Sequence, residues 1–165
     1  MRIAIVGANG HVGLELCFLF ERADHEVIPI VRNELGAAFL RRHGFAPRVA
    51  DVNDSEDVTR ALKGAEIIVL AANATDVGGS SRKSLNINQK MIENAEKSVH
   101  IVTTASGVVR KLDNLGSILK KMSEKGVKIK IIAPLNESAK KSLENLSKVK
   151  AKSIDGLKAR FVIVD

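Results

Sequence analysis

The feature that most constrains this chain is a glycine loop near its start. Gly7, Gly10 and Gly13 stand at the spacing Gly-x-x-Gly-x-x-Gly. The apolar run 3–6 directly before them predicts a strand of a parallel sheet that is buried on both faces. Apolar residues at helical spacing follow up to Phe20. A strand, a glycine turn and a helix in this order predict a loop that binds the pyrophosphate of a dinucleotide.

Each glycine of this loop has a physical task in that prediction. Gly7 permits the tight turn, Gly10 lets the backbone approach the pyrophosphate, and Gly13 lets the helix pack closely on the strand. The start of the helix then offers free N–H groups and a partial positive charge to the phosphates. Three of the residues between the glycines complete the expected binding segment, namely Asn9, His11 and Val12. The alternative is a glycine-rich turn that serves packing alone.

A basic residue occupies the position that would read the cofactor ribose. Arg32 follows the predicted second strand, 27–31, and lies 19 residues after Gly13. An NAD site places a carboxylate there to accept from the ribose 2′-OH, whereas an arginine pairs with a 2′-phosphate. Arg32 therefore favours NADP over NAD, with Arg41 and Arg42 as possible helpers. The alternative is that Arg32 is a solvated strand end.

Strand and helix patterns continue to alternate along the whole chain. Further strands are predicted at 48–50, 66–70, 100–104, 127–132, 151–154 and 160–164, and helices at 34–43, 55–63, 83–97, 112–125 and 137–147. This alternation predicts an α/β, doubly wound, Rossmann-like fold with a mostly parallel sheet in a single three-layer domain. We expect a dinucleotide-binding half, 1–76, a join at 77–82 and a second half, 83–165. Each half is small by itself, so both are expected to share one continuous sheet.

The charge of the chain changes abruptly near its middle. Residues 1–79 carry 8 basic and 11 acidic side chains, a net charge of −3, whereas residues 80–165 carry 18 and 8, a net charge of +10. This break suggests two segments of different origin, joined as a natural fusion or an engineered chimera. The lysines of the second half are spread over several predicted helices with no aromatic residues among them for base stacking. A solvated basic face is therefore favoured, and nucleic acid is an unlikely partner.

Other chemistry-bearing residues give weaker signals. Cys17 lies in an apolar helical run, which predicts a buried structural thiol. The four histidines show no ligand-like spacing with acids or Cys17, so no metal site is predicted. No stretch is long and apolar enough to span a bilayer, and the first strand leaves no room for a signal peptide. We therefore expect a cytoplasmic protein without a membrane partner.

Two segments of the first half resemble the extended and atypical short-chain dehydrogenase/reductases. Arg48-Val49-Ala50-Asp51-Val52 is similar to the third-strand motif of that family, and residues 61–73 are similar to its fourth strand. The resemblance covers residues 1–75. It implies an NAD(P) cofactor whose adenosine and nicotinamide-ribose sites are lined by Asp51, Val52, Ala71 and Ala72.

The catalytic pair of that family is missing. Its chemistry uses a Tyr-x-x-x-Lys pair, and these 165 residues contain no tyrosine. Thr103, Thr104 and Ser106 stand where the active-site serine of the family would follow the fifth strand, but without the tyrosine they are predicted to be polar strand-end residues. No catalytic residue is therefore predicted.

The second half resembles a different family. Residues 91–102, 125–135 and 156–165 are similar to the effector-binding domain of archaeal TrmB-type transcription regulators, which is related to the phospholipase D fold. Active phospholipase D-type enzymes carry His-x-Lys-x-x-x-x-Asp, whose positions are taken here by Lys158, Arg160 and Asp165. Because the nucleophilic histidine is absent, the resemblance implies binding of a small-molecule effector and no hydrolysis.

The sequence thus leaves three functional hypotheses. The first is a non-catalytic NADP-type dinucleotide-binding or sensing protein, for which a gene fusion or chimera is a candidate origin. The second is an NAD(P)-dependent oxidoreductase or epimerase with atypical catalytic residues. The third is a regulator-like effector-binding module.

Overall fold

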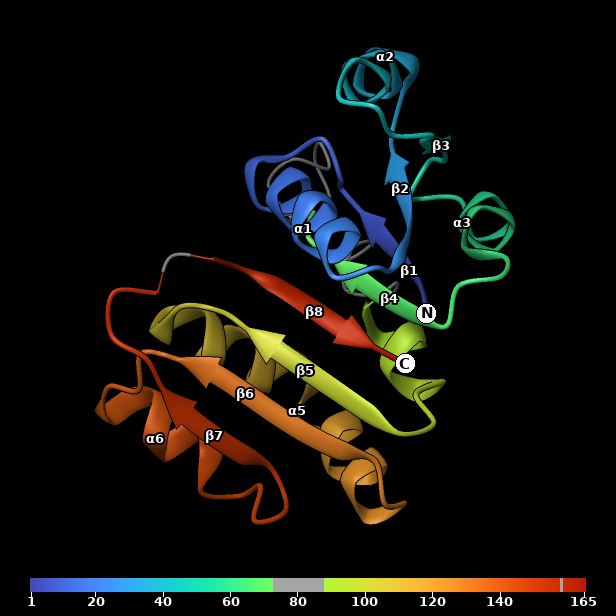
Figure 1. Ribbon diagram of the computed structural model, residues 1–165. Coiled ribbons are helices and arrows are strands. Elements are labelled where there is room, and N and C mark those ends of the chain that lie inside the picture. Colours follow the sequence, from blue (N-terminus) through green and yellow to red (C-terminus); the bar gives the residue numbers. More distant parts are fainter. Residues whose placement is uncertain (73–87, 158) are drawn as a thin grey trace. The chain divides into compact units, whose positions relative to one another are not determined.

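The computed structural model describes residues 1–72, 88–157 and 159–165, which fall into two compact units, Met1–Ile87 and Asn88–Asp165. Both units alternate strands and helices (Figure 1). The α/β, Rossmann-like class and the mostly parallel strand arrangement are confirmed. The predicted join 77–82 and the start of the predicted helix 83–97 lie outside the described residues. The sharing of one sheet by both halves stays a prediction.

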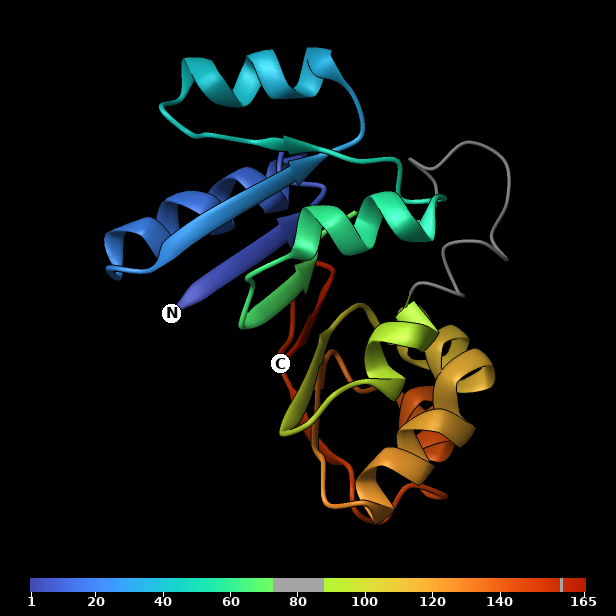
Figure 2. The same ribbon diagram turned by 90° about the vertical axis from the view of Figure 1, so that its right-hand side faces the viewer.

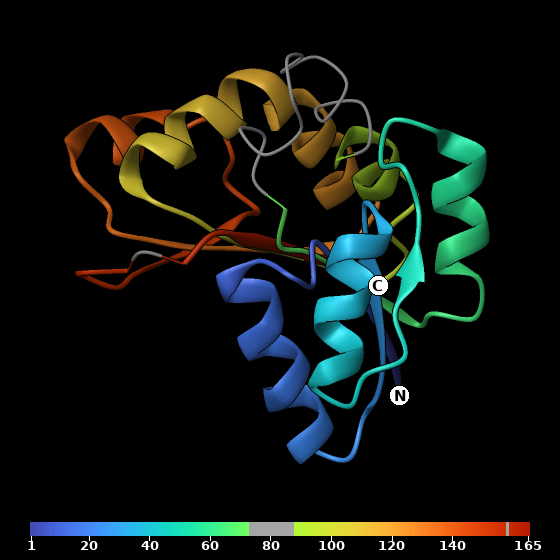
Figure 3. The same ribbon diagram turned by 90° about the horizontal axis from the view of Figure 1, so that it is seen from above.

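The first unit contains four parallel strands in the order β3-β2-β1-β4. Its elements in chain order are β1 (Arg2–Val6), α1 (His11–Arg22), β2 (Glu26–Val31), α2 (Glu34–Arg42), β3 (Arg48–Val49), α3 (Ser55–Leu62) and β4 (Ile67–Leu70). Helices α1 and α2 lie on one side of these strands and α3 on the other (Figure 3). This arrangement follows from right-handed crossovers, because the chain moves outward from β1 to β3 and then returns to β4.

Pro29 lies inside β2 without breaking it. In a parallel strand alternate residues direct their backbone groups to opposite neighbours: the Ile30 carbonyl accepts from Gly7 after β1, and the Val31 carbonyl accepts from Ala50 after β3. The backbone N–H that Pro29 lacks would therefore face β3. Pairing with β3 begins only at Ile30, which lies beside Arg48. The proline is tolerated because no ladder hydrogen bond is lost there.

The second unit has the strand order β8-β5-β6-β7. Strands β5 (Ser98–Val102), β6 (Lys128–Ala133) and β7 (Lys150–Ser153) are parallel, and β8 (Phe161–Val164) runs antiparallel beside β5. Helices α5 (Ala105–Glu124) and α6 (Glu137–Leu143) lie on one face of these strands (Figure 2), and residues 88–93 are also helical. The described helices include none with the length and apolar character needed to cross a membrane.

Helix α5 begins seven residues earlier than the sequence pattern predicts. Thr104 is its N-cap, and the Thr104 hydroxyl accepts a hydrogen bond from the Gly107 N–H at 3.3 Å. The residues that follow include a glycine and two valines, which are weak helix formers. The first turns form despite this composition because Val108 and Leu112 are buried against the sheet.

Candidate dinucleotide-binding site

The glycine loop connects the carboxyl end of β1 to α1. Gly7 has a φ of 81°, a left-handed conformation that favours glycine. Its N–H donates to the Ile30 carbonyl at 2.9 Å, which holds the loop against the end of β2. The Gly10 N–H donates back to the Gly7 carbonyl at 3.1 Å, so the turn is closed by its own backbone. The turn predicted for Gly7 is present.

Gly13 and Gly7 both lie where a side chain has no room. A Cβ atom on Gly13 would stand 2.2 Å from the Gly7 carbonyl oxygen and 2.8 Å from the Ala8 Cα. A Cβ on Gly7 would stand 2.7 Å from the backbone nitrogen of Ala72, the second residue after β4. The loop, the first turn of α1 and the end of β4 are therefore packed backbone to backbone. Such packing forms the cradle in which this type of loop holds a pyrophosphate.

The N-terminus of α1 differs in its capping from those of α2, α3, α5 and α6. Side chains accept backbone hydrogen bonds at the starts of α2, α3, α5 and α6, from Asn33, Asp54, Thr104 and Asn136. Gly10 caps α1 without a side-chain hydrogen bond, and the first turn carries no acidic residue. The N–H groups of His11, Val12 and Gly13 precede the first intrahelical bond, which the Leu14 N–H makes with the Gly10 carbonyl. They remain available for an anion, and the helix dipole favours one there.

Asn9 joins the loop to the start of α2. A Cβ on Gly36 would lie 2.9 Å from Asn9 Nδ2 and 3.2 Å from its Cγ, so the Asn9 side chain rests directly on Gly36. The Gly36 N–H itself donates to Asn33 Oδ1 at 3.0 Å. Sequence reasoning missed Gly36 and Asn33. An asparagine after a predicted strand, followed by a glutamate and an apolar helical pattern, is the capping signal that could have revealed Asn33.

The structure places Arg32 beside this junction but separates it from its predicted helpers. Arg32 is exposed and follows β2 directly, one residue before the cap of α2. Arg41 and Arg42 lie in the last turn of α2, about 12 Å along the helix from its start. Arg41 is also ion-paired with Glu34, at 3.2 Å between Nη1 and Oε2. Arg32 therefore remains the candidate ribose-reading cation, and the helper roles of Arg41 and Arg42 are not supported.

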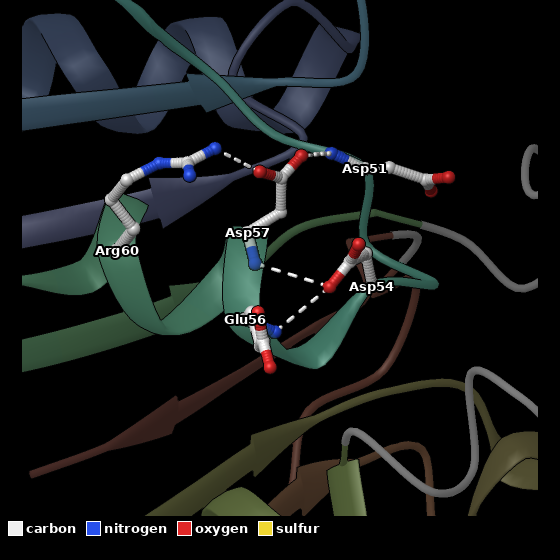
Figure 4. Close-up of polar contacts among 5 residues, drawn as sticks. All are labelled: Asp51, Asp54, Glu56, Asp57 and Arg60. Atoms are coloured by element: carbon white, nitrogen blue, oxygen red, sulfur yellow. Dashed lines mark hydrogen bonds and ion pairs between the residues drawn. The ribbon is translucent and has the colours of Figure 1, made fainter.

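Asp51 follows β3 in a hydrogen-bonded turn (Figure 4), and Val52 is the next residue along the chain. The Asp51 N–H donates to Asp57 Oδ2 at 3.2 Å, and Asp51 Oδ1 accepts from the Asn53 backbone N–H and side-chain amide, both at 2.9 Å. Asp57 is in turn paired with Arg60. The Asp51 carboxylate is exposed and held at the carboxyl end of β3, on the same sheet edge as the glycine loop. Val52 is half-buried beside it.

Ala71 and Ala72 continue from β4 at the same edge. The Ala71 N–H donates to the Val6 carbonyl at 2.9 Å, and the Ala72 backbone lies against Gly7. The first unit therefore places all the predicted binding residues at the carboxyl ends of its parallel strands, where open α/β sheets bind their ligands. Their role in binding stays a prediction.

The polar residues after β5 lie in the second unit. Thr103 is 1% exposed, and its N–H donates to the Ile132 carbonyl at 3.0 Å. Thr104 is the α5 cap described above, and Ser106 is exposed with its hydroxyl 3.4 Å from that of Thr104. Thr103 and Thr104 thus have structural roles. Ser106 is an exposed hydroxyl in the first turn of a helix.

Cys17 is fully buried inside α1, as the sequence predicts. Burial raises the pKa of the Cys17 thiol to about 12, and the nearby Glu21 carboxylate adds to this effect. The thiol is therefore protonated at neutral pH, when a nucleophile would need to be a thiolate. Among the described residues, no group of three or more His, Cys, Asp and Glu side chains is arranged to hold a metal ion.

The first unit has four parallel strands and a glycine loop that leads into a helix without a side-chain cap. These features define the class of protein, a Rossmann-type nucleotide-binding fold. The comparison with family models makes this more specific. A model described as NAD(P)H-binding matches residues 7–148, most of the chain. The chain belongs to this NAD(P)H-binding family.

Two curated relatives match about half of the chain. It is 34% identical over 83 residues to the uncharacterized sugar epimerase YhfK of Bacillus subtilis, an alignment of 49% of this chain and 37% of that protein. It is 32% identical over 76 residues to the uncharacterized protein C2A9.02 of Schizosaccharomyces pombe, covering 46% and 26% of the two. The aligned part is thus well under half the length of either relative.

Solved structures with the same fold include two with bound cofactors. The NADPH-dependent quinone oxidoreductase QOR2 of Escherichia coli, complexed with NADPH, has a TM-score of 0.54 at 22% identity, covering 81% of this chain and 48% of that one. The 3-ketoacyl-(acyl-carrier-protein) reductase of Brucella melitensis, complexed with NADH, has a TM-score of 0.51 at 18% identity, covering 92% and 85%. The Lmo0794 protein of Listeria monocytogenes has a TM-score of 0.55 at 18% identity, covering 94% and 100%. At these identities the likeness is one of fold.

The comparisons change the interpretation of the second half. The family match continues across the predicted join and reaches residue 148, so it includes most of the segment compared above with TrmB-type regulators. The short-chain dehydrogenase-like resemblance of the first half is supported. The resemblance to TrmB-type or phospholipase D-type proteins, the archaeal-like character and the fusion hypothesis receive no support. A change of charge balance within one family's fold is sufficient to account for the break, because surface charge does not determine a fold.

Proposed function

We propose that this chain binds NADP(H) at the Gly7–Gly13 loop and supplies the cofactor-binding part of an NAD(P)-dependent oxidoreductase or epimerase. The observation that carries the proposal is the backbone-packed cradle beneath the start of α1, where Gly10 makes no side-chain capping hydrogen bond. A side chain at Gly7 or Gly13 would fill this cradle, and the N–H groups of the first helical turn face it without a side-chain cap. A pyrophosphate is the group that such a cradle fits.

The preference for NADP(H) over NAD(H) is proposed from Arg32. Its guanidinium follows β2 at the position where a carboxylate would read the 2′-OH of NAD, and it would form a charge-assisted contact with a 2′-phosphate. Asn9 and the capped start of α2 support this position, because they connect the glycine loop to the residue after Arg32. Asp51, at the end of β3, would lie toward the adenosine.

Calorimetric titration of the full chain with NADPH and NADH tests the cofactor proposal. We expect NADPH to bind more tightly, and Arg32→Asp to weaken NADPH binding by about 10- to 150-fold, equivalent to one lost charge-assisted contact of roughly 1.5–3 kcal/mol. Arg42→Asp makes the same change of charge at the other end of α2 and should leave the NADPH affinity within about twofold. Equal affinity of the unmodified protein for both cofactors would contradict the preference.

The oxidoreductase or epimerase class is proposed from the family and from the relatives, one of which is named as a sugar epimerase and another as a quinone oxidoreductase. When bound, the cofactor would supply a hydride donor or acceptor. These 165 residues contain no tyrosine that could exchange the proton that accompanies the hydride. Ser106, the exposed hydroxyl at the start of α5, is the residue we would test first for that role.

A non-catalytic binding or sensing role is the second candidate, and the absence of tyrosine favours it. The two are separated by following NADPH absorbance with aldehydes, quinones and nucleotide sugars as substrates. Sustained turnover that Ser106→Ala abolishes, with unchanged NADPH affinity, would establish the enzyme. Tight NADPH binding without turnover on the whole panel would favour the binding role.

A further inference from the structure

Three cationic side chains occupy one end of the second unit. Arg110 and Lys111 lie in the second turn of α5, and Arg160 stands directly before β8. Lys111 is half-buried, and both arginines are near enough to act on its charge. All three residues belong to the second unit, whereas the glycine loop belongs to the first.

The strand pairing explains how residues 49 positions apart in the chain come together. Strand β8 is antiparallel to β5, and its first residue, Phe161, pairs with Val102, the last residue of β5. Arg160 therefore lies at the carboxyl end of β5, where the chain turns through Thr104 into α5. Lys111 lies about 9 Å along that helix from its start. The carboxyl ends of strands are the edge at which α/β sheets bind ligands.

The charge around Lys111 is unbalanced. Burial lowers the pKa of Lys111, and the neighbouring charges of Arg110 and Arg160 lower it further. The ion pairs found within the described residues are Arg41–Glu34, Arg60–Asp57 and Lys140–Glu137, none of which includes a member of the cluster.

The nearest acid along α5 does not restore the balance. Asp113 lines a groove between α5 and α6, and at two residues from Lys111 it points to the opposite side of the helix. Two arginine charges beside a half-buried ammonium are unfavourable for folding unless an anion joins them.

We propose that Arg110, Lys111 and Arg160 bind the oxyanion of a small molecule, a phosphate or a carboxylate. The two guanidinium groups present planar pairs of N–H donors that match two oxygens of either group, and the ammonium adds a point charge. The shared chemistry is that of an anionic metabolite bound at the edge of the β5–α5 turn. This inference concerns the second unit and does not depend on the cofactor proposal.

Nuclear magnetic resonance of the full chain tests the proposal, with inorganic phosphate and acetate as probes. The arginine Nε–Hε signals of Arg110 and Arg160 should shift and saturate with one dissociation constant. Tighter binding of phosphate would identify a phosphate ester as the ligand class, and tighter binding of acetate a carboxylate. The backbone amides of Gly10 and Gly13 report the loop in the same spectra, so failure at one site is visible independently of the other.

Two variants and a control make the outcome decisive. Arg160→Gln and Lys111→Met, which keeps the apolar stem, should each raise the dissociation constant at least about tenfold. Lys150→Gln removes one charge from the exposed strand β7 and should change it less than about twofold. Shifts that never saturate, or equal weakening by Lys150→Gln, would overturn the proposal. So would a single-stranded oligonucleotide that binds the same residues far more tightly than phosphate, because the surface would then be one for nucleic acid.

Discussion

Replacing Gly13 with alanine tests the cradle directly. The new Cβ would lie 2.2 Å from the Gly7 carbonyl oxygen, and contacts below 3.0 Å are essentially never found for real Cβ atoms. The first turn of α1 must therefore retreat by at least about 0.8 Å. Both obstructing groups, the Gly7 carbonyl and the Ala8 Cα, are backbone atoms, and hydrogen bonds from Gly7 and Ala8 to Ile30 hold them in place.

The loss of stability expected for Gly13→Ala follows from the fixed position of these backbone atoms. Overpacking costs about 1–3 kcal/mol, and the intrinsic helix preference of alanine over glycine returns up to about 1 kcal/mol. We expect Gly13→Ala to reduce the free energy of unfolding by about 2 kcal/mol, which lowers the melting temperature by roughly 4–8 °C. The displaced N–H groups should also weaken NADPH binding at least about tenfold.

The same substitution at Gly116 is the matched control. Gly116 lies within α5, and a Cβ built there has nothing within 4 Å. Gly116→Ala should therefore stabilise the protein by about 0.5–1 kcal/mol and leave NADPH affinity unchanged. Melting curves by circular dichroism and calorimetric titration measure both quantities. If Gly13→Ala melts at or above the unmodified temperature and binds NADPH normally, the close contact of α1 with the loop has been misjudged.

Two further predictions concern buried titratable groups. Because burial raises the pKa of Cys17 to about 12, the folded protein should resist thiol reagents at neutral pH and react fully in denaturant; fast labelling of the native state would contradict this. Lys111→Met should be more stable than the unmodified protein at neutral pH, because the folded state lowers the pKa of the ammonium below its unfolded value. That advantage should shrink as the pH rises through the lowered pKa toward the unfolded value, and an advantage independent of pH in denaturant titrations would refute the electrostatic cause.

Local patterns in the sequence were sufficient for the α/β class and for the glycine loop. A strand buried on both faces must be continuously apolar, and the turn after it needs glycines where the backbone is left-handed or closely approached. These requirements act on neighbouring residues, so residues 3–13 display them directly. The buried state of Cys17 follows in the same way from its place on the apolar side of a helix.

Where local signals conflicted, the predictions from the sequence were less reliable. Gly107 and two valines hid the true start of α5, which depends on the Thr104 cap and on burial of Val108 against the sheet. The break in charge suggested two origins, but surface charge does not determine a fold, and the family match extends through it.

Only the tertiary structure decided which distant residues meet. It brought Asn9 onto Gly36 and placed Ala72 against Gly7, while it kept Arg41 and Arg42 at the far end of α2. It also gathered Arg160 with Lys111, because β8 runs antiparallel to β5. Periodicity records which face of an element is buried, but contacts between elements depend on strand order and direction, which no single segment encodes.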